Sequence, residues 1–460
     1  MNYLSDKNWQ SDETQTLLNK VAQVLLILII VSVPFSIRYV ISSTWNFQLG
    51  AYSDFTSFSI YISDFLILGF ITTVLFIKKG DKPVSNLWKI SGLVLVGWLI
   101  LELVIHKFNL PEVYFTFRLI GLLLFSYSLS KIAVSREKIA WLFTGLGSVQ
   151  ALIALIQFTF QHSLGLRWIG ESIFSIDTLG VAKVVSDGLT LVRGYGTFPH
   201  ANILAGFLVI STLLNIYLLN KSSQEESSDF KPELSKILLY IMLFINTFGL
   251  FISFSRGGIL ALAVAILFIL SKLVLNKQYI PFRKVIVSCG TLFAISTVFL
   301  FPFLSSRVTV SDQASHERTL YNSIGVELII NNPILGHGLG QSLLHMKQIS
   351  DTSFGIRLNP WEIQPIHNFW LISAADLGIG SIFVFLLLII PIFGLFKSLS
   401  EPKDFWRLTL TSTWVAILCL FVIDHYFYTI WSTEVLLWFF VGLTLSTVPR
   451  EANPNIQKVT

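Results

Sequence analysis

Three arginines and one histidine are the side chains of this chain best suited to chemistry: Arg193, Arg256, Arg318 and His367. A guanidinium keeps its charge when it is partly desolvated, and its planar fork of donors can bridge two phosphate oxygens. A neutral imidazole can accept a proton from a hydroxyl group. The set therefore predicts a site that binds a phosphorylated ligand and activates a hydroxyl.

Arg256 stands in Ser253-Phe-Ser-Arg-Gly-Gly258, where one apolar run ends and the next begins. A charge at mid-bilayer costs at least about 2.5–3.5 kcal/mol, which favours a junction that faces a cavity. Ser255 can cap the following helix, whose first N–H groups would add to a phosphate site. The alternative is an interfacial arginine that only anchors the helix end.

Arg193 ends a predicted β-hairpin, because Asp187-Gly188 between runs rich in β-branched residues favours a tight turn. A second helix is expected directly after it. Thr197 can cap that helix, and Pro199 suits its first turn. Arg193 is thus predicted to lie, like Arg256, against a helix start.

His367 precedes the apolar run that begins at Asn368. At a helix N-terminus the dipole disfavours the imidazolium, so the ring is predicted to be neutral and able to act as a base. A capping or interfacial histidine is the simpler alternative. Arg318 lies in a long polar loop, where ion pairing with Glu317 or Glu327 explains it nearly as well as phosphate binding.

Further polar side chains accompany these four. His200, His337 and Asn368 are expected to flank the same site and contact substrate. Four ionisable residues at or in apolar segments stay unassigned, since each can equally be one half of a structural pair: Asp64, Glu102, Asp424 and His425.

The elements that position these residues are membrane spans. Of the 460 residues 53% are hydrophobic, and the mean hydropathy is +0.70. About twelve apolar segments have the length that a bilayer requires, so we expect an all-α integral membrane protein. They lie near 20–41, 56–77, 88–106, 113–134, 138–160, 200–220, 235–254, 257–275, 284–304, 368–396, 406–423 and 430–448.

Positive charge gives the orientation. Most of the 32 Lys and Arg residues fall in one set of alternate loops together with both termini. The positive-inside rule puts that set in the cytoplasm and the four candidate residues on the extracytoplasmic side. The net charge of +5 is spread over short loops, which does not favour nucleic acid binding.

The chain divides into five predicted regions. Five N-terminal spans cover 1–160, an extracytoplasmic loop with the hairpin covers 161–199, spans six to nine cover 200–304, a large extracytoplasmic loop covers 305–366, and spans ten to twelve cover 367–460. The large loop contains a predicted helix that ends near Asn331-Asn-Pro333. Loops of this length without spans are usually functional.

No His, Cys or carboxylate group has the sequence spacing of a metal site, and no phosphate-binding glycine loop or nucleophile elbow occurs. We therefore expect neither a bound metal nor a cofactor.

Four motifs in this order resemble the O-antigen ligase and polymerase family of bacterial membrane glycosyltransferases. They are Arg193…Gly196-Thr-Phe-Pro-His-Ala-Asn-Ile-Leu-Ala-Gly206, Ser255-Arg-Gly-Gly258, Glu317-Arg318 running into Asn332-Pro-Ile-Leu-Gly-His-Gly-Leu-Gly340, and His367-Asn368. The likeness runs from about Arg193 to the last span, and the first five spans agree only in number. The chain departs from the family at His337, where the family usually has a small apolar residue. It departs again in Gly378-Ile-Gly-Ser, which lacks the final glycine, aromatic residue or threonine that the family commonly has after the last histidine.

The resemblance implies a metal-independent, inverting transfer of an undecaprenyl-pyrophosphate-linked glycan to an acceptor hydroxyl outside the cytoplasmic membrane. By similarity, Arg193 and Arg256 would hold the departing pyrophosphate, His367 would take the acceptor proton, and Arg318 would contact phosphate. The implied partners are this donor, a lipid-linked or glycan acceptor, and membrane lipid around the N-terminal spans.

Other functions remain open. The acceptor can be a lipid-linked core, as for a ligase, a second lipid-linked repeat, as for a polymerase, or a protein hydroxyl, as for a protein O-oligosaccharyltransferase. A transporter or flippase of lipid-linked glycans would bind the same phosphates without breaking a bond. Transport favours paired charges along several spans and an internal repeat, and neither is evident in the sequence.

Overall fold

The computed structural model describes residues 12–78, 84–178, 180–186, 189–224, 230–275, 290, 313–400 and 404–448. Within them the chain is mostly helical, with two small two-stranded sheets. The N-terminal helices are α1 (Asp12–Ser32), α2 (Ile62–Leu75), α3 (Asn86–Ile105), α4 (Leu110–Leu129) and α5 (Arg136–Phe160). The central ones are α6 (Ala201–Gln224), α7 (Phe230–Ile252) and α8 (Arg256–Leu275). The remainder are α10 (Gln313–Asn331), α11 (Ser342–Phe354), α12 (Phe369–Leu377), α13 (Ser381–Lys397), α14 (Phe405–Ile423), α15 (Tyr426–Thr429) and α16 (Trp431–Thr447).

Nine helices in the described part of the chain are long and apolar enough to cross a membrane. Two other predicted spans form shorter helices, α2 with 14 residues and α16 with 17. The predicted span 284–304 lies outside the described residues. The all-helical membrane architecture is thus confirmed in its coarse form, whereas the number twelve stays a prediction.

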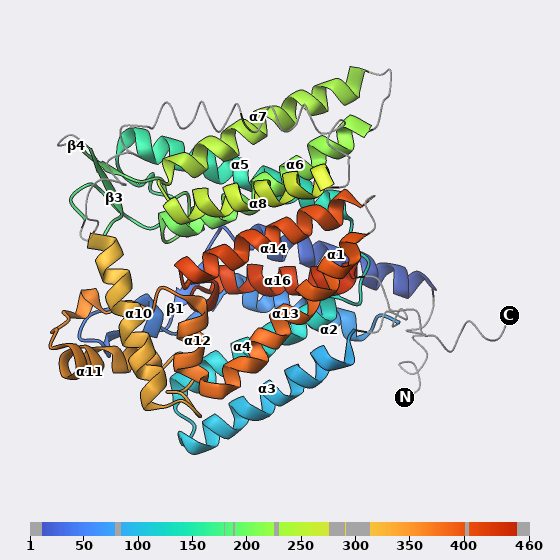
Figure 1. The fold of residues 1–460 in the computed structure, drawn as a ribbon. Coiled ribbons are helices and arrows are strands. Elements are labelled where there is room, and N and C mark those ends of the chain that lie inside the picture. Colours follow the sequence, from blue (N-terminus) through green and yellow to red (C-terminus); the bar gives the residue numbers. More distant parts are fainter. Residues whose placement is uncertain are drawn as a thin grey trace, which may run out of the picture.

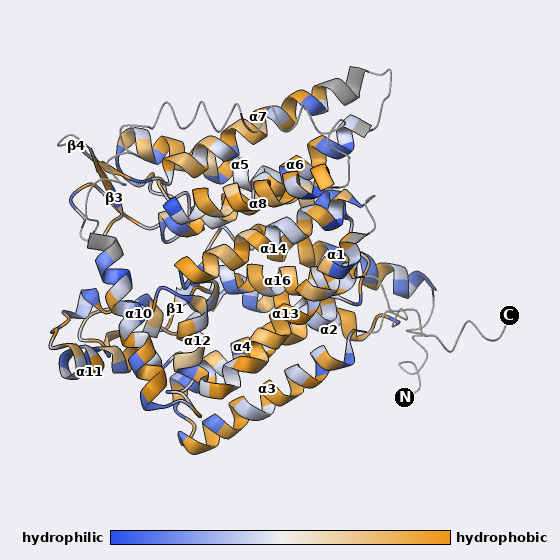
Figure 2. Cartoon of the chain, viewed as in Figure 1, coloured by the Kyte–Doolittle hydropathy of each residue, from blue (hydrophilic) through white to orange (hydrophobic). Residues whose placement is uncertain are grey.

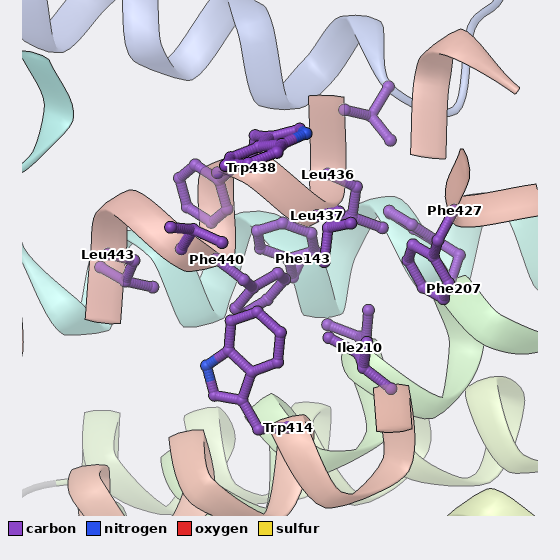
Figure 3. Close-up of a cluster of buried hydrophobic side chains, with 14 of the residues drawn as sticks. Phe143, Phe207, Ile210, Trp414, Phe427, Leu436, Leu437, Trp438, Phe440 and Leu443 are labelled. Atoms are coloured by element: carbon purple, nitrogen blue, oxygen red, sulfur yellow. The ribbon is translucent and has the colours of Figure 1, made fainter. Parts of the chain in front are cut away.

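Aromatic and branched side chains from four helices hold the bundle together. Apolar residues cover the bundle helices along their length (Figure 2). Phe143 of α5, Phe207 of α6, Trp414 of α14 and Phe440 of α16 belong to one buried cluster (Figure 3). The ring centroids of Phe143 lie 5.7 Å from those of both Phe207 and Phe440. This packing fixes the ends of α6 and α14, between which polar groups gather.

The predicted span 368–396 is a broken helix. The short 3₁₀ turn η5 (Gly378–Gly380) separates α12 from α13. Gly378 has a φ of +53°, and a Cβ there would meet the carbonyl oxygen of Ile334 at 2.2 Å. The backbone N–H of Ile379 donates to that same oxygen over 3.0 Å. The glycine therefore lets the turn after α10 dock on the break.

The first predicted span also ends earlier than expected. α1 ends at Ser32, and residues 33–61 form a cap with two 3₁₀ turns, η1 (Thr44–Phe47) and η2 (Asp54–Thr56), between strands β1 (Arg38–Val40) and β2 (Ser59–Tyr61). Hydropathy missed this cap because its apolar residues extend the apolar runs on both sides. Together with α10, α11 and the β3–β4 hairpin (Lys183–Ser186 and Leu189–Val192), β1 lies at one end of the bundle (Figure 1).

Candidate functional site

A pocket of about 440 Å³ brings the three predicted arginines together. Arg193 follows β4, Arg256 begins α8, and Arg318 lies on α10, yet all three line this pocket. Asp424 is the single carboxylate among its described lining residues. We call this cavity the arginine pocket. Its excess of positive charge matches a ligand with more than one negative charge.

Arg193 is held by the hairpin that the sequence predicted. β3 and β4 pair antiparallel, with Lys183 opposite Val192, while the turn at 187–188 lies outside the described residues. The side chain of Arg193 is buried. Its Nε donates to the carbonyl of Ser253 over 2.5 Å, and a terminal nitrogen donates to Oδ1 of Asn202 over 2.6 Å. The guanidinium is thus fixed in place before any ligand binds.

Two glutamines of α5 hold the segment between Arg193 and α6. Oε1 of Gln157 accepts the backbone N–H groups of Tyr195 and Gly196 over 3.1 and 2.9 Å. Oε1 of Gln150 accepts the N–H of Thr197 over 2.8 Å. Sequence analysis missed both residues, although two polar residues seven apart in an apolar run share one helix face.

The predicted cap of α6 was wrong. Thr197 donates its hydroxyl to the carbonyl of Pro34 over 2.5 Å, and α6 begins only at Ala201. His200 occupies the capping position, since its Nδ1 accepts the N–H of Asn202 over 3.0 Å. Burial and, to a smaller extent, the nearby Arg193 lower the pKa of His200 to about 3. His200 therefore lies beside the arginine pocket as a neutral ring.

Arg256 is the first residue of α8, as predicted. Oγ of Ser255 accepts the N–H of Gly258 over 3.3 Å and caps the helix. A Cβ at Gly258 would meet Cβ of Ala205 at 2.7 Å, so the glycine allows α8 to start close against α6. The Arg256 side chain is exposed and lines the pocket.

Asp424 ends α14 and links the charged groups. Its Oδ2 accepts the side-chain N–H of Asn202 over 3.0 Å and lies 3.9 Å from Arg318. Asn202 thus bridges Arg193 and Asp424. Burial alone would raise the pKa of the Asp424 carboxyl, but the neighbouring histidines and Arg318 lower it to about 2. The carboxylate is therefore ionised at neutral pH.

His367 stands beside Asp424. Its ring stacks on Tyr321 at 5.7 Å and meets His425 edge-on at 4.9 Å. Burial lowers the pKa of His367, although Asp424 opposes the shift. The ring is therefore neutral at pH 7, as predicted, with burial as the main cause. Its Nδ1 is buried and makes no hydrogen bond to other described residues.

Asn368 fixes the position of His367. Its Oδ1 caps α12 by accepting the N–H groups of Trp370 and Leu371 over 2.9 and 3.1 Å. Its Nδ2 donates to the carbonyl of Val422 over 3.2 Å and so ties α12 to the end of α14. These contacts make Asn368 a positioning residue, whereas substrate contact was the expectation from sequence.

His337, expected to flank the same site as His200, lies elsewhere. Its Nε2 is 3.1 Å from the carbonyl oxygen of Leu328, and its ring lies 4.5 Å from that of His345. The glycine-rich turn around it docks on α12, where the N–H of Gly340 donates to Asp376 over 2.8 Å. His337 therefore belongs to the packing of the α10–α11 region.

Two further residues complete the site. His425, left unassigned by the sequence, contacts His367 and places its Nδ1 2.6 Å from the hydroxyl of Thr429. The hydroxyl of Tyr426 is buried, lines the arginine pocket, and has no hydrogen-bond partner among the described residues. No motif marked Tyr426, because its placement depends on how α15 turns back against α6.

The structure corrects the expectation, drawn from sequence spacing, that no His, Cys or carboxylate residues form a group suited to a metal ion. Potential ligand atoms of His367, Asp424 and His425 lie within 4.8 Å of one another. Sequence spacing missed the group because His367 is far along the chain from the other two. The adjacent guanidinium of Arg318 disfavours a cation here, so the surroundings suit an anion better.

Residues 241–386 match the family model described as O-Antigen ligase. No curated protein matches the chain. The matched segment contains Arg256, Arg318 and His367, while Arg193 precedes it. This match and the apolar helices make the chain a multi-pass membrane enzyme of the glycosyltransferase type. The family resemblance found in its motifs is thus confirmed by this match, over residues 241–386.

Proposed function

We propose that this protein transfers a glycan from undecaprenyl pyrophosphate to an acceptor hydroxyl, on the outer face of the cytoplasmic membrane. The observation that carries the proposal is the arginine pocket, where three guanidiniums from distant segments face one carboxylate. A diphosphate leaving group develops additional negative charge as its bond to the sugar breaks. Fixed positive groups aimed at that charge lower the barrier.

The proposed reaction is a single displacement. The acceptor oxygen attacks the anomeric carbon and forms the new glycosidic bond, while the bond from that carbon to the pyrophosphate oxygen breaks. The acceptor proton passes to the neutral ring of His367, whose lowered pKa suits a base at neutral pH. Undecaprenyl pyrophosphate leaves with the bonding electrons, and attack from the opposite face inverts the anomeric carbon.

Each pocket group has a proposed role in this step. Arg193 and Arg256 would hold the pyrophosphate, and Arg318 would add a further phosphate contact. Arg193 needs little reorganisation, because Ser253 and Asn202 already orient it. The buried hydroxyl of Tyr426 can donate to a phosphate oxygen. Asp424 would position the site through Asn202 and His425, whose backbone N–H donates to it over 2.9 Å.

A reconstituted assay tests the proposal. Full-length protein in nanodiscs would receive an undecaprenyl-pyrophosphate glycan with a lipid-linked core, a second lipid-linked repeat or a hydroxyl-bearing protein, without added metal. We expect a new glycosidic bond and release of undecaprenyl pyrophosphate, and the productive acceptor separates ligase, polymerase and protein transferase. In proteoliposomes, movement of the intact donor across the bilayer without a new bond would instead establish a transporter.

A further inference from the structure

A second cavity of about 760 Å³ adjoins the arginine pocket. Its walls come from α4, α12, α13 and α16, from the start of α11, and from α15. The two cavities meet at α15: Tyr426 lines the arginine pocket, and Phe427, Tyr428 and Thr429 line the second cavity. We call this second cavity the α15 chamber.

The candidate base stands between the two cavities. Pro365 and Phe369, on either side of His367 in the chain, both line the α15 chamber. His425 lies edge-on to His367 and contacts Thr429, a chamber residue, through its Nδ1. Phe55, another chamber residue, packs its ring 5.7 Å from that of His425. A group in the chamber would therefore lie close to both histidines.

The charge of the α15 chamber is opposite to that of the arginine pocket. Its described lining contains two carboxyl residues, Asp376 and Glu434, and no lysine, arginine or histidine. Phosphate groups are disfavoured in such a cavity, because nothing in its lining compensates their negative charge. The ligand for this cavity is thus an uncharged group.

Glu434 distinguishes a sugar from a hydrocarbon as that group. The Asp376 carboxylate is already occupied by the N–H groups of Gly340 and Ser342, over 2.8 and 3.0 Å. The Glu434 side chain makes no hydrogen bond to any other described residue. It is therefore available to accept hydrogen bonds from ligand hydroxyls. An isoprenoid chain would leave this carboxyl without a partner at a cost.

Aromatic rings supply the remaining contact surface. Phe55, Phe115, Phe427 and Trp438 line the chamber together with the Glu434 carboxyl. Sugars present both C–H faces and hydroxyls, and this combination of flat apolar rings and a carboxyl matches both. We infer that the α15 chamber, with Glu434 as its hydrogen-bond acceptor, binds an uncharged sugar ring of the acceptor. The identification of this sugar as the acceptor rests on the proposed function. Sugar binding itself can be measured without catalysis.

The experiment measures binding in the absence of donor. Methyl β-D-glucoside is titrated against the full-length protein in nanodiscs, with saturation-transfer NMR as readout and farnesol as an uncharged isoprenoid probe. Glu434→Leu should raise the dissociation constant for the glucoside at least about tenfold, because a hydrogen-bonding carboxyl is lost from the chamber. Glu327→Gln on α10, a carboxyl outside both cavities, is the matched control and should leave it unchanged.

A second variant tests whether the loss of binding could come from misfolding. Phe115→Leu removes one ring that α4 contributes to the chamber and should also weaken glucoside binding. A thermal unfolding midpoint near that of the unaltered protein shows that the variant folds. Unchanged glucoside binding in both folded variants would overturn the inference. So would saturable binding of farnesol that displaces the glucoside.

Kinetics separate this inference from the proposed function. In a transfer assay Glu434→Leu should raise KM for the acceptor and leave KM for the donor unchanged. Arg256→Ala should strongly reduce transfer yet keep glucoside binding. Glucoside binding without any transfer would refute the proposed function alone. Transfer with an unaltered acceptor KM in Glu434→Leu would refute the inference alone.

Discussion

Two arginine sites in this protein, around Arg118 and in the arginine pocket, differ in how their charge is balanced. Arg118, on α4, donates to Asp64 over 3.0 Å and to the carbonyl of Ser59 over 2.9 Å. Its guanidinium also lies 4.1 Å from the ring centre of Trp431 and 4.5 Å from that of Tyr114. Carbonyl, carboxylate and ring faces thus surround one cation. In the arginine pocket, by contrast, three arginines and one described carboxylate, Asp424, line the same cavity.

The difference shows why Arg118 and Asp64 join α2, α4 and the start of α16, whereas the pocket arginines are arranged around a cavity. Glu102, the other unassigned carboxyl of the N-terminal spans, is only partly satisfied, since its Oε2 is buried without a hydrogen bond to other described residues. Its Oε1 accepts the indole N–H of Trp98 over 2.6 Å, and the same N–H is 3.2 Å from the carbonyl of Leu377. A compensated charge stabilises the packing of spans. A cluster with excess charge is suited to a ligand.

The largest expected effect is on transfer by the pocket variants. Arg256→Ala and His367→Ala should each lower kcat/KM roughly 10²–10⁴-fold, because a charge that stabilises the leaving group or a general base is lost. Their thermal unfolding midpoints should stay near that of the unaltered protein. Cys419→Ala, on α14 outside the pocket, should retain full transfer. A comparable loss in Cys419→Ala would break the distinction between site and scaffold.

Arg118→Ala should show the reverse pattern. Removing one partner of this partly buried pair leaves the other without its hydrogen bond, at a cost of about 1–3 kcal/mol. The backbone amides of α2 and α4 should become less protected from hydrogen exchange, and the thermal unfolding midpoint in detergent should fall. Protein that remains folded should keep the KM values of the unaltered chain. A selective rise in donor KM would instead place Arg118 among the binding residues.

The pH dependence of transfer sharpens the role of His367. Its pKa lies below the ordinary value of 6.5, so the ring is neutral and can act as a base at neutral pH. When the pH falls through that lowered pKa, the ring becomes protonated and can no longer accept a proton. The kcat/KM profile should therefore have an acid limb below pH 6.5 that falls about tenfold per pH unit. In Asp424→Asn this limb should move to lower pH, because the opposing effect of the carboxylate is removed. An unmoved limb would contradict the assignment to His367.

The smallest effect is expected at His337. It lies with His345 in the α10–α11 region, so His337→Ala should change donor KM by no more than about twofold, as for substitutions away from a site. A larger change in donor KM at unchanged stability would return His337 to the group of substrate-binding residues.

Local patterns were enough for several features of the site. The hairpin before Arg193, the cap of α8 at Ser255 and the end of α10 at Asn331 were each predicted from neighbouring residues. Such features depend on hydrogen bonds within a few residues, which sequence records directly. The cap at Thr197 failed for the opposite reason, because a distant carbonyl at Pro34 takes its hydroxyl.

Sequence by itself determined that the chain crosses a membrane several times and that Arg193, Arg256, Arg318 and His367 belong to segments which can meet. Only the tertiary structure decided which polar residues join them. Asn202 and Asp424 form a hydrogen bond although more than two hundred residues separate them in the sequence. His337 lies apart from the arginines because its turn packs against Gly378. The physical reason is that hydropathy sets the length of a span, whereas the rotation and neighbours of each helix follow from close packing between distant parts of the chain.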